Sequence, residues 1–268
     1  MSCSELRINR DVVNKVANIL RKVGLDRILS IELMDPQFKA IKNLSTACRE
    51  LSPILSYLNA LVSYQLNCRG EDYWWEFSDY MRRVCTIIGD DKIVEILIEF
   101  IKSSKCNRVG KDIKARRVLR LRNVLSDICK LSFREDYISV WKLTYKVLES
   151  KPYSKTVVFS IKMLYYGLRA IRNRVKTLPY EIPIPIDRRI AKITYSIGLI
   201  LGTKHRSQIL RCPQIATKAW SLISKLSSIP PLHIDSLIWL IPNKSLSNDL
   251  RSILGNELTK EIEELIKL

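Results

Sequence analysis

Membrane and secretion signals are the first features that this chain lacks. Its longest uncharged stretch, residues 51–68, contains serine, proline, asparagine and glutamine, whereas a membrane-spanning helix needs about 20 mostly apolar residues. We therefore expect a buried helix in this stretch and no membrane partner. The opening sequence MSCSELRINR also lacks the apolar segment of a secretory signal peptide.

Closely spaced metal ligands are missing as well. The seven cysteines include no CxxC pair, and neither His205 nor His233 stands at zinc-site spacing from a cysteine. Iron–sulfur clusters also need closely spaced thiolates, so we expect no metal and no other cofactor. An odd number of cysteines without a secretory signal is typical of a reducing cytoplasm, where we expect mostly buried free thiols.

Glycine is scarce, and strand-like alternation of apolar and polar residues is absent. Only 8 of the 268 residues are glycine, and apolar residues recur every three or four positions, for example in residues 12–20, 93–101 and 118–128. This period is that of helices with one buried face. We therefore predict an all-α protein of about a dozen helices.

Prolines mark the expected division of the chain. Prolines 179, 183 and 185 fix an extended path that cannot continue a helix, and a second break lies near residues 49–53. We predict one helical subdomain from residues 1–51 plus 179–268, and an inserted helical subdomain from residues 52–178. A cleft between two such subdomains is a natural place for a site.

Acidic residues are outnumbered by basic ones. The chain has 27 acidic and 45 basic residues and a net charge of +18. The basic residues are spread through the predicted helices, most densely over residues 111–122. A folded basic surface suits the phosphate backbone of a nucleic acid. On charge alone, a basic protein without a nucleic-acid partner remains an alternative.

Two ionisable residues stand at predicted helix starts. Lys155 follows Ser154, a suitable N-cap residue, and the helix dipole disfavours a protonated lysine in the first turn, which favours nucleophilic chemistry. Asp187 ends the sequence IPIPID and is itself expected to cap a helix. A carboxylate held there could stabilise positive charge that develops on a sugar ring. An exposed surface lysine and a purely capping aspartate are the alternatives.

Two segments carry residues suited to holding a flat ring. Asp235 and Trp239 are one helical turn apart and share a face, so a carboxylate beside an indole could hold a flipped base. Trp74 and Trp75 are adjacent, and two adjacent tryptophans on a helix cannot both face the core. One of them is expected to face a cleft, a partner or solvent. Ordinary core packing is the alternative for both segments.

Three long motifs in this order resemble those of the archaeal 8-oxoguanine DNA glycosylases called AGOG, a divergent branch of the helix-hairpin-helix glycosylase superfamily. They are KTVVFSIK at residues 155–162, LPYEIPIPID at 178–187 and PPLHIDSLIW at 230–239. The likeness extends over residues 35–240. It implies an all-α fold of two helical subdomains with the site in a cleft between them. It also implies a monomeric, cytoplasmic, nucleoid-associated enzyme acting on duplex or single-stranded DNA that contains 8-oxoguanine.

The resemblance also implies residue roles. Lys155 would be the nucleophile that attacks the sugar carbon bearing the damaged base, and Asp187 would be the acidic partner that assists base departure. The covalent imine would then permit β-elimination, making the protein an 8-oxoguanine DNA N-glycosylase and AP lyase. The residues that would bind the oxidised purine are Gln37 and Asp235 by hydrogen bonds, Trp74 and Trp239 by stacking, and Phe159 and Lys162 along the helix of Lys155.

One departure from the superfamily concerns its hairpin. That hairpin usually carries glycines whose amides hold a DNA phosphate, whereas residues 147–154 here read VLESKPYS. Lys151 or Ser154 would then have to replace that contact. Two further interpretations are a superfamily glycosylase for another damaged base, and a non-catalytic helical protein that binds DNA or RNA through its basic helices.

Overall fold

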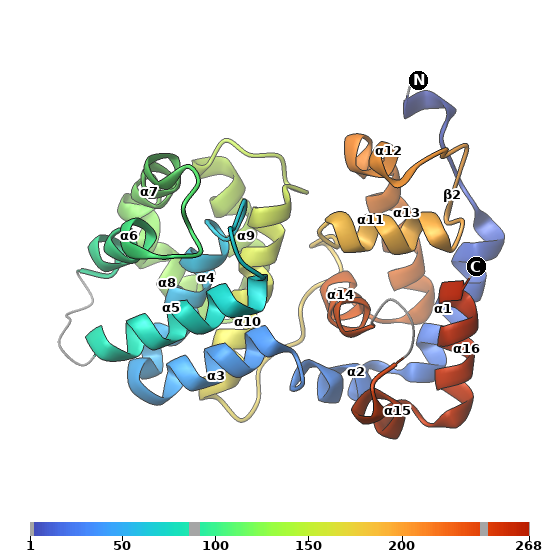
Figure 1. Cartoon of the computed structure of the whole chain (residues 1–268), viewed down its shortest axis with the longest axis horizontal. Coiled ribbons are helices and arrows are strands. Elements are labelled where there is room, and N and C mark those ends of the chain that lie inside the picture. Colours follow the sequence, from blue (N-terminus) through green and yellow to red (C-terminus); the bar gives the residue numbers. More distant parts are fainter. Residues whose placement is uncertain (1–2, 86–91, 242–245, 268) are drawn as a thin grey trace. The chain divides into compact units, whose positions relative to one another are not determined.

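Helices make up nearly all of the regular structure in the computed structural model, which describes residues 3–85, 92–241 and 246–267 (Figure 1). Within these residues the chain forms sixteen α-helices and two strands of two residues each. The prediction of an all-α fold is therefore confirmed. The strands are β1 (Arg7–Ile8) and β2 (Ile200–Leu201), which pair antiparallel.

The chain divides into two units. Unit 1 comprises Met1–Asp35 and Leu178–Leu268, and unit 2 comprises Pro36–Thr177. The first boundary falls earlier in the chain than the predicted break after Leu51. The physical reason is that helix α3 (Pro36–Cys48) packs against α5 (Gly70–Val84) and α10 (Lys155–Ile171) of unit 2. The second boundary lies between Thr177 and Leu178, one residue before the predicted boundary. It coincides with the start of residues 178–186, which we call the proline-rich loop.

Unit 2 is built around the pair α4 and α10. Helix α4 (Ser52–Ala60) is buried along its whole length and ends at Ala60, so only the first half of the predicted buried helix over residues 51–68 is helical. Gly167 of α10 lies directly against Pro53 of α4. The other helices of this unit are α6 (Ile93–Ser103), α7 (Lys111–Leu119), α8 (Leu125–Phe133) and α9 (Tyr137–Val147).

Unit 1 has its own apolar core, and Trp220 lies in it. Helix α1 (Arg10–Val23) starts at a side-chain cap from Asn9 and packs along α13 (Pro213–Ser227). The indole nitrogen of Trp220 donates a 2.9 Å hydrogen bond to Thr194 Oγ1, which satisfies the buried polar edge of the ring. The remaining helices are α2 (Leu25–Glu32), α11 (Arg188–Ser196), α12 (Arg206–Arg211), α14 (Pro231–Leu240), α15 (Asn248–Leu254) and α16 (Asn256–Lys267).

Six of the seven cysteines form disulfides, so the prediction of mostly free thiols is wrong. The pairs are Cys3–Cys212, Cys48–Cys85 and Cys68–Cys106, with Cα–Cα distances of 5.8, 5.2 and 5.2 Å. Their partners are 209, 37 and 38 residues apart in the sequence. Such separations form no short spacing motif, because only the tertiary fold brings the sulfur atoms together.

No helix in the described ranges is both long and apolar enough to span a membrane. The same residues contain no group of three or more histidine, cysteine, aspartate or glutamate side chains placed to hold a metal ion.

Candidate active site

Lys155 stands at the end of a hairpin that folds without glycine. Helix α9 ends at Val147, and Glu149 then adopts a left-handed conformation with φ of 49°, a conformation that usually favours glycine. The indole nitrogen of Trp141 donates a 2.9 Å hydrogen bond to the carbonyl of Pro152 and so holds the tip of the hairpin. Ser154 occupies the predicted N-cap position, although its side chain makes no capping hydrogen bond. Lys155 is the exposed first residue of α10.

The first turn of α10 is held by a residue that the sequence analysis missed. Nη2 of Arg117, on α7, donates a 3.0 Å hydrogen bond to Oγ1 of Thr156, the residue after Lys155. Burial lowers the pKa of the Arg117 guanidinium. No sequence motif links α7 to α10, so only the packing of unit 2 reveals this contact.

Trp74 and Phe159 meet in unit 2. Their ring centroids lie 6.2 Å apart with the planes nearly perpendicular, an edge-to-face arrangement that aromatic pairs favour. Trp74 is 1% exposed and also contacts Phe77, whereas Trp75 is 40% exposed. The adjacent tryptophans thus divide as expected, with Trp75 as the one that faces outward.

Gln37 and Lys162 are buried polar residues of the same unit. Gln37 is 5% exposed, near the start of α3, and its amide nitrogen approaches Gly70 at the start of α5. Lys162 is 1% exposed, and its Nζ lies 5.5 Å from the ring centroid of Tyr166. Four of the predicted binding residues therefore belong to helices α3, α5 and α10, and α3 packs against both of the other two.

Asp187 caps α11 as predicted. Its Oδ1 accepts 2.8 Å hydrogen bonds from the backbone amides of Arg189 and Ile190, and the residue is 8% exposed. The four residues 182–185 before it are buried, which holds the extended approach to the cap in place. The carboxylate is therefore fixed in direction by the helix that it starts.

A buried network fixes the start of the loop that leads to Asp187. His233 Nε2 accepts a 3.0 Å hydrogen bond from the backbone amide of Leu178. The other ring nitrogen, Nδ1, lies 2.7 Å from Glu32 Oε1, which also accepts a bond from Ser236. Because Nε2 accepts, the ring proton belongs on Nδ1, where it donates to Glu32. This network joins α2, α14 and the proline-rich loop.

Asp235 and Trp239 lie one turn apart on α14. Asp235 is fully buried and Trp239 is half-buried. The guanidinium of Arg189 lies 4.2 Å from the ring centroid of Trp239, and its Nη1 donates a hydrogen bond to the Trp239 carbonyl. Sequence analysis did not predict this contact, although the position of Arg189, two residues after Asp187, offers a signal.

The family model described as AGOG, N-glycosylase/DNA lyase, matches residues 17–267. The chain belongs to the AGOG family. An N-glycosylase/DNA lyase of Methanopyrus kandleri is 36% identical over 255 residues, which cover 93% of this chain and 97% of the relative. One of Methanococcus maripaludis is 33% identical, with coverage of 97% and 98%. The crystal structure of the 8-oxoguanine DNA glycosylase Pa-AGOG of Pyrobaculum aerophilum, complexed with 8-oxoguanosine, superimposes with a TM-score of 0.81 at 27% identity over 97% of both chains.

Membership in the AGOG family makes this protein a DNA glycosylase and DNA lyase with the all-helical fold of that family. DNA is therefore its substrate, and the interpretation as a non-catalytic binding protein is excluded. Its positive net charge suits this polyanionic partner.

The catalytic and base-binding residues that were predicted for this AGOG enzyme are distributed over both units. Gln37, Trp74, Lys155, Phe159 and Lys162 belong to unit 2, whereas Asp187, Asp235 and Trp239 belong to unit 1. Within unit 2 the structure brings Trp74 against Phe159, and within unit 1 Arg189 joins Asp187 to Trp239.

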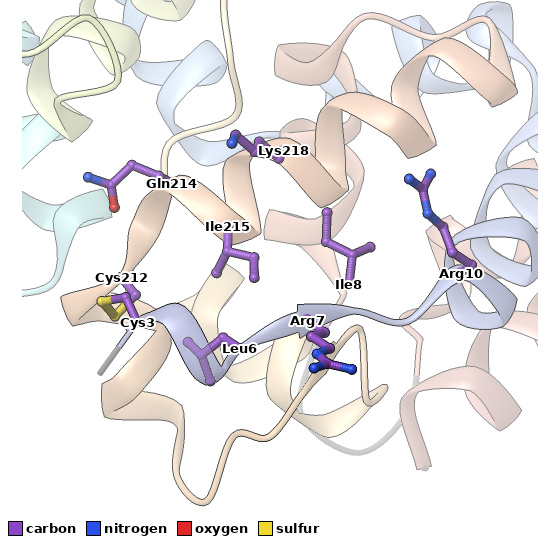
Figure 2. Close-up of a pocket in the computed structure, with 9 residues that line it drawn as sticks. All are labelled: Cys3, Leu6, Arg7, Ile8, Arg10, Cys212, Gln214, Ile215 and Lys218. Carbon is purple, nitrogen blue, oxygen red and sulfur yellow. A yellow bond between two sulfur atoms is a disulfide. The ribbon is translucent and has the colours of Figure 1, made fainter. Parts of the chain in front are cut away.

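A surface hollow of about 540 Å³ in unit 1 contains none of these residues. Figure 2 shows Ile8 and Ile215 between the N-terminal strand and α13, with Arg10 and Lys218 beside them. The disulfide Cys3–Cys212 closes one end of this hollow.

Proposed function

We propose that this AGOG enzyme excises 8-oxoguanine from DNA through a Schiff base on Lys155 and then nicks the strand by β-elimination. The observation that carries the proposal is the likeness, over 97% of both chains, to a glycosylase whose structure was solved with 8-oxoguanosine. The accessible amine of Lys155 at the start of α10 supports the assignment of the nucleophile.

The proposed reaction needs only Lys155, the damaged DNA and water as reactants. The amine of Lys155 donates its electron pair to the C1′ atom of the damaged nucleotide, and the bond from C1′ to the base breaks. The base leaves with the electron pair of the broken bond and takes up a proton. A proton passes from the nitrogen to the ring oxygen as the bond from C1′ to that oxygen breaks, which opens the sugar ring and gives the protonated imine. Removal of a C2′ proton then expels the 3′ phosphate. Water then hydrolyses the imine and regenerates the lysine.

Asp187 is proposed to stabilise the positive charge that develops on the sugar as the base departs. Its carboxylate is held by two backbone amides, so it needs little reorganisation during the reaction. By accepting a proton from the attacking amine, this carboxylate would also assist the attack.

Selectivity is proposed to come from hydrogen bonds that only the lesion can make. 8-Oxoguanine carries a hydrogen on N7, whereas N7 of guanine is an acceptor. Gln37 and Asp235 offer side-chain oxygens, and both residues are almost fully buried. A site that is built to accept a hydrogen bond from its substrate strongly rejects a base that lacks the donor. Trp74, Phe159, Lys162 and Trp239 would supply the stacking and polar walls.

Borohydride trapping on a duplex with one 8-oxoguanine tests the nucleophile. Wild type should give a covalent protein–DNA band, and Lys155→Gln should give none while still binding the duplex. Lys146→Gln, at an exposed lysine of the preceding helix α9, is the matched control and should trap normally. A band with Lys155→Gln would move the nucleophile to another lysine, and no band with wild type would contradict the proposed lesion.

Asp187→Asn tests the proposed catalytic role of the carboxylate separately from its role as the N-cap of α11. Asparagine caps helices about as well as aspartate, so the fold should be retained. Single-turnover excision should fall by about 100-fold or more, as is typical when a charged catalytic group is removed. Unchanged excision would reduce Asp187 to a capping residue.

A further inference from the structure

We propose that Arg189 is a positioning residue that holds Trp239 in place for base stacking and ties it to Asp187. This inference rests on the proposed function, because it concerns how the damaged base is held. Arg189 contacts both residues within unit 1, through its backbone amide to Asp187 and through its side chain to Trp239.

The position of Arg189 is unfavourable for the local stability of its helix. Arg188 and Arg189 open α11, and no acidic residue occupies its first turn. The positive end of a helix dipole favours acidic residues and disfavours cations there. Arg188 remains exposed, whereas Arg189 is half-buried and reaches across to α14. The contact of Arg189 with α14 therefore provides the stabilising interaction that offsets its unfavourable position at the start of α11.

The contact with Trp239 has two parts. Trp239 belongs to the last turn of α14, where backbone carbonyls have no partner within the helix. Arg189 Nη1 donates to the Trp239 carbonyl, and a cation at this end of a helix interacts favourably with the dipole. The guanidinium also lies over the indole at 4.2 Å from its centroid, within the range of a cation–π interaction.

This arrangement decides which face of the indole can receive a base. An indole has two faces, and the guanidinium covers one of them. A flipped purine can therefore stack only on the opposite face. The backbone amide of Arg189 also binds the Asp187 carboxylate, so one residue contacts both the stacking ring and the proposed catalytic carboxylate. A substitution of the Arg189 side chain leaves this backbone amide in place. A lysine could supply the charge here but not the planar stacking group.

Comparison of two reactions, excision of 8-oxoguanine and strand cleavage at an abasic site, distinguishes this positioning role from a general structural role. A duplex with 8-oxoguanine needs base stacking, whereas a duplex with a preformed abasic site offers no base to stack. Arg189→Met should slow excision of 8-oxoguanine by about tenfold, the size of one partly buried cation–π contact. Strand cleavage at the abasic site should be unchanged. Arg189→Lys should lie closer to Arg189→Met than to wild type.

Matched variants give the controls. Arg188→Met removes the same charge from the exposed neighbour and should leave the ratio of the two rates unchanged. In a Trp239→Leu background, Arg189→Met should have no additional effect on excision, because its partner ring is gone.

Each result distinguishes this inference from the proposed function. A wild type that cleaves the abasic duplex but does not excise 8-oxoguanine would overturn the proposed lesion and this role with it. Normal excision by wild type and by Arg189→Met would overturn only the role of Arg189. An equal fall in both rates, or loss of folding by both Arg189 variants while Arg188→Met folds, would assign Arg189 a purely structural role. An undiminished effect in the Trp239→Leu background would overturn its action through Trp239.

Discussion

The side-chain amide nitrogen of Gln37 lies 4.0 Å from the position that a β-carbon on Gly70 would occupy. These residues stand at the starts of α3 and α5, and the disulfide Cys48–Cys85 joins the other ends of the same two helices. The two helices therefore run parallel, fastened at one end by a covalent bond. At the other end, the absence of a side chain on Gly70 leaves room for the amide of Gln37.

Enlarging Gly70 should therefore impair recognition of the damaged base. A β-carbon at 4.0 Å is in ordinary contact, so Gly70→Ala should retain excision of 8-oxoguanine. The additional methyl groups of Gly70→Val would enter the space of the Gln37 amide and should slow excision by about tenfold, the loss of one hydrogen bond. Cleavage of a preformed abasic site should be unaffected. Equal single-turnover excision rates for the alanine and valine variants would show that Gln37 does not need this space.

Gly167→Ala should destabilise the protein. A β-carbon on Gly167 would lie 2.4 Å from Pro53 Cα and 2.9 Å from Pro53 N, and backbone atoms cannot move aside as a flexible side chain can. Helices α4 and α10 would have to separate, at a cost of about 1–3 kcal/mol in the free energy of unfolding. Urea denaturation measures this loss. Gly70→Ala, which places a methyl group in open contact, is the matched control and should show no comparable loss.

The sequence was sufficient to predict the helical class and the two helix starts that carry Lys155 and Asp187. Those features depend on local signals, namely apolar periodicity, capping residues and proline. The boundary at Asp35 could not be predicted, because it depends on how α3 packs and not on a break in the chain.

Contacts between distant segments could not be predicted from the sequence either. Arg117 reaches Thr156, and Arg189 reaches Trp239, through packing that no spacing encodes. Trp74 was singled out as one of two adjacent tryptophans, with a stacking role implied by the family resemblance, yet its contact with Phe159 required the structure. The disulfides were missed for the same reason, since the rule that led to free thiols concerns the cellular compartment and not geometry.

Raising the pH should stabilise the protein through Lys114. Burial lowers the pKa of Lys114 to about 8 from its ordinary value of 10.5, while its ammonium donates a 2.6 Å hydrogen bond to the Tyr64 carbonyl. Below about pH 8 the folded and unfolded chains both hold this proton, and burial of the charge carries its full cost. Between pH 8 and 10.5 the unfolded chain binds more protons, so stability rises with pH.

The comparison of wild type with Lys114→Met isolates this effect, because other titrating groups are common to both. The free energy of unfolding of wild type relative to the variant should rise by at most about 1.4 kcal/mol per pH unit in this window. Urea denaturation at several pH values measures it, and Lys105→Met at an exposed lysine is the control. A difference that stays constant from pH 8 to 10.5 would contradict the lowered pKa of Lys114.

Loss of the Cys3–Cys212 disulfide should weaken the protein under oxidising conditions. The bond closes a loop of 209 residues and ties the N-terminal segment to the start of α13, so its removal frees a large part of the unfolded chain. Cys3→Ser should lower the free energy of unfolding by about 2–5 kcal/mol.

A reducing agent should lower the stability of wild type and of Cys129→Ser alike, because Cys129 belongs to no disulfide. Alkylation without prior reduction, read by mass spectrometry, should modify one cysteine of the seven. Modification of all seven would show that the thiols are reduced, and Cys3→Ser would then have little effect on stability.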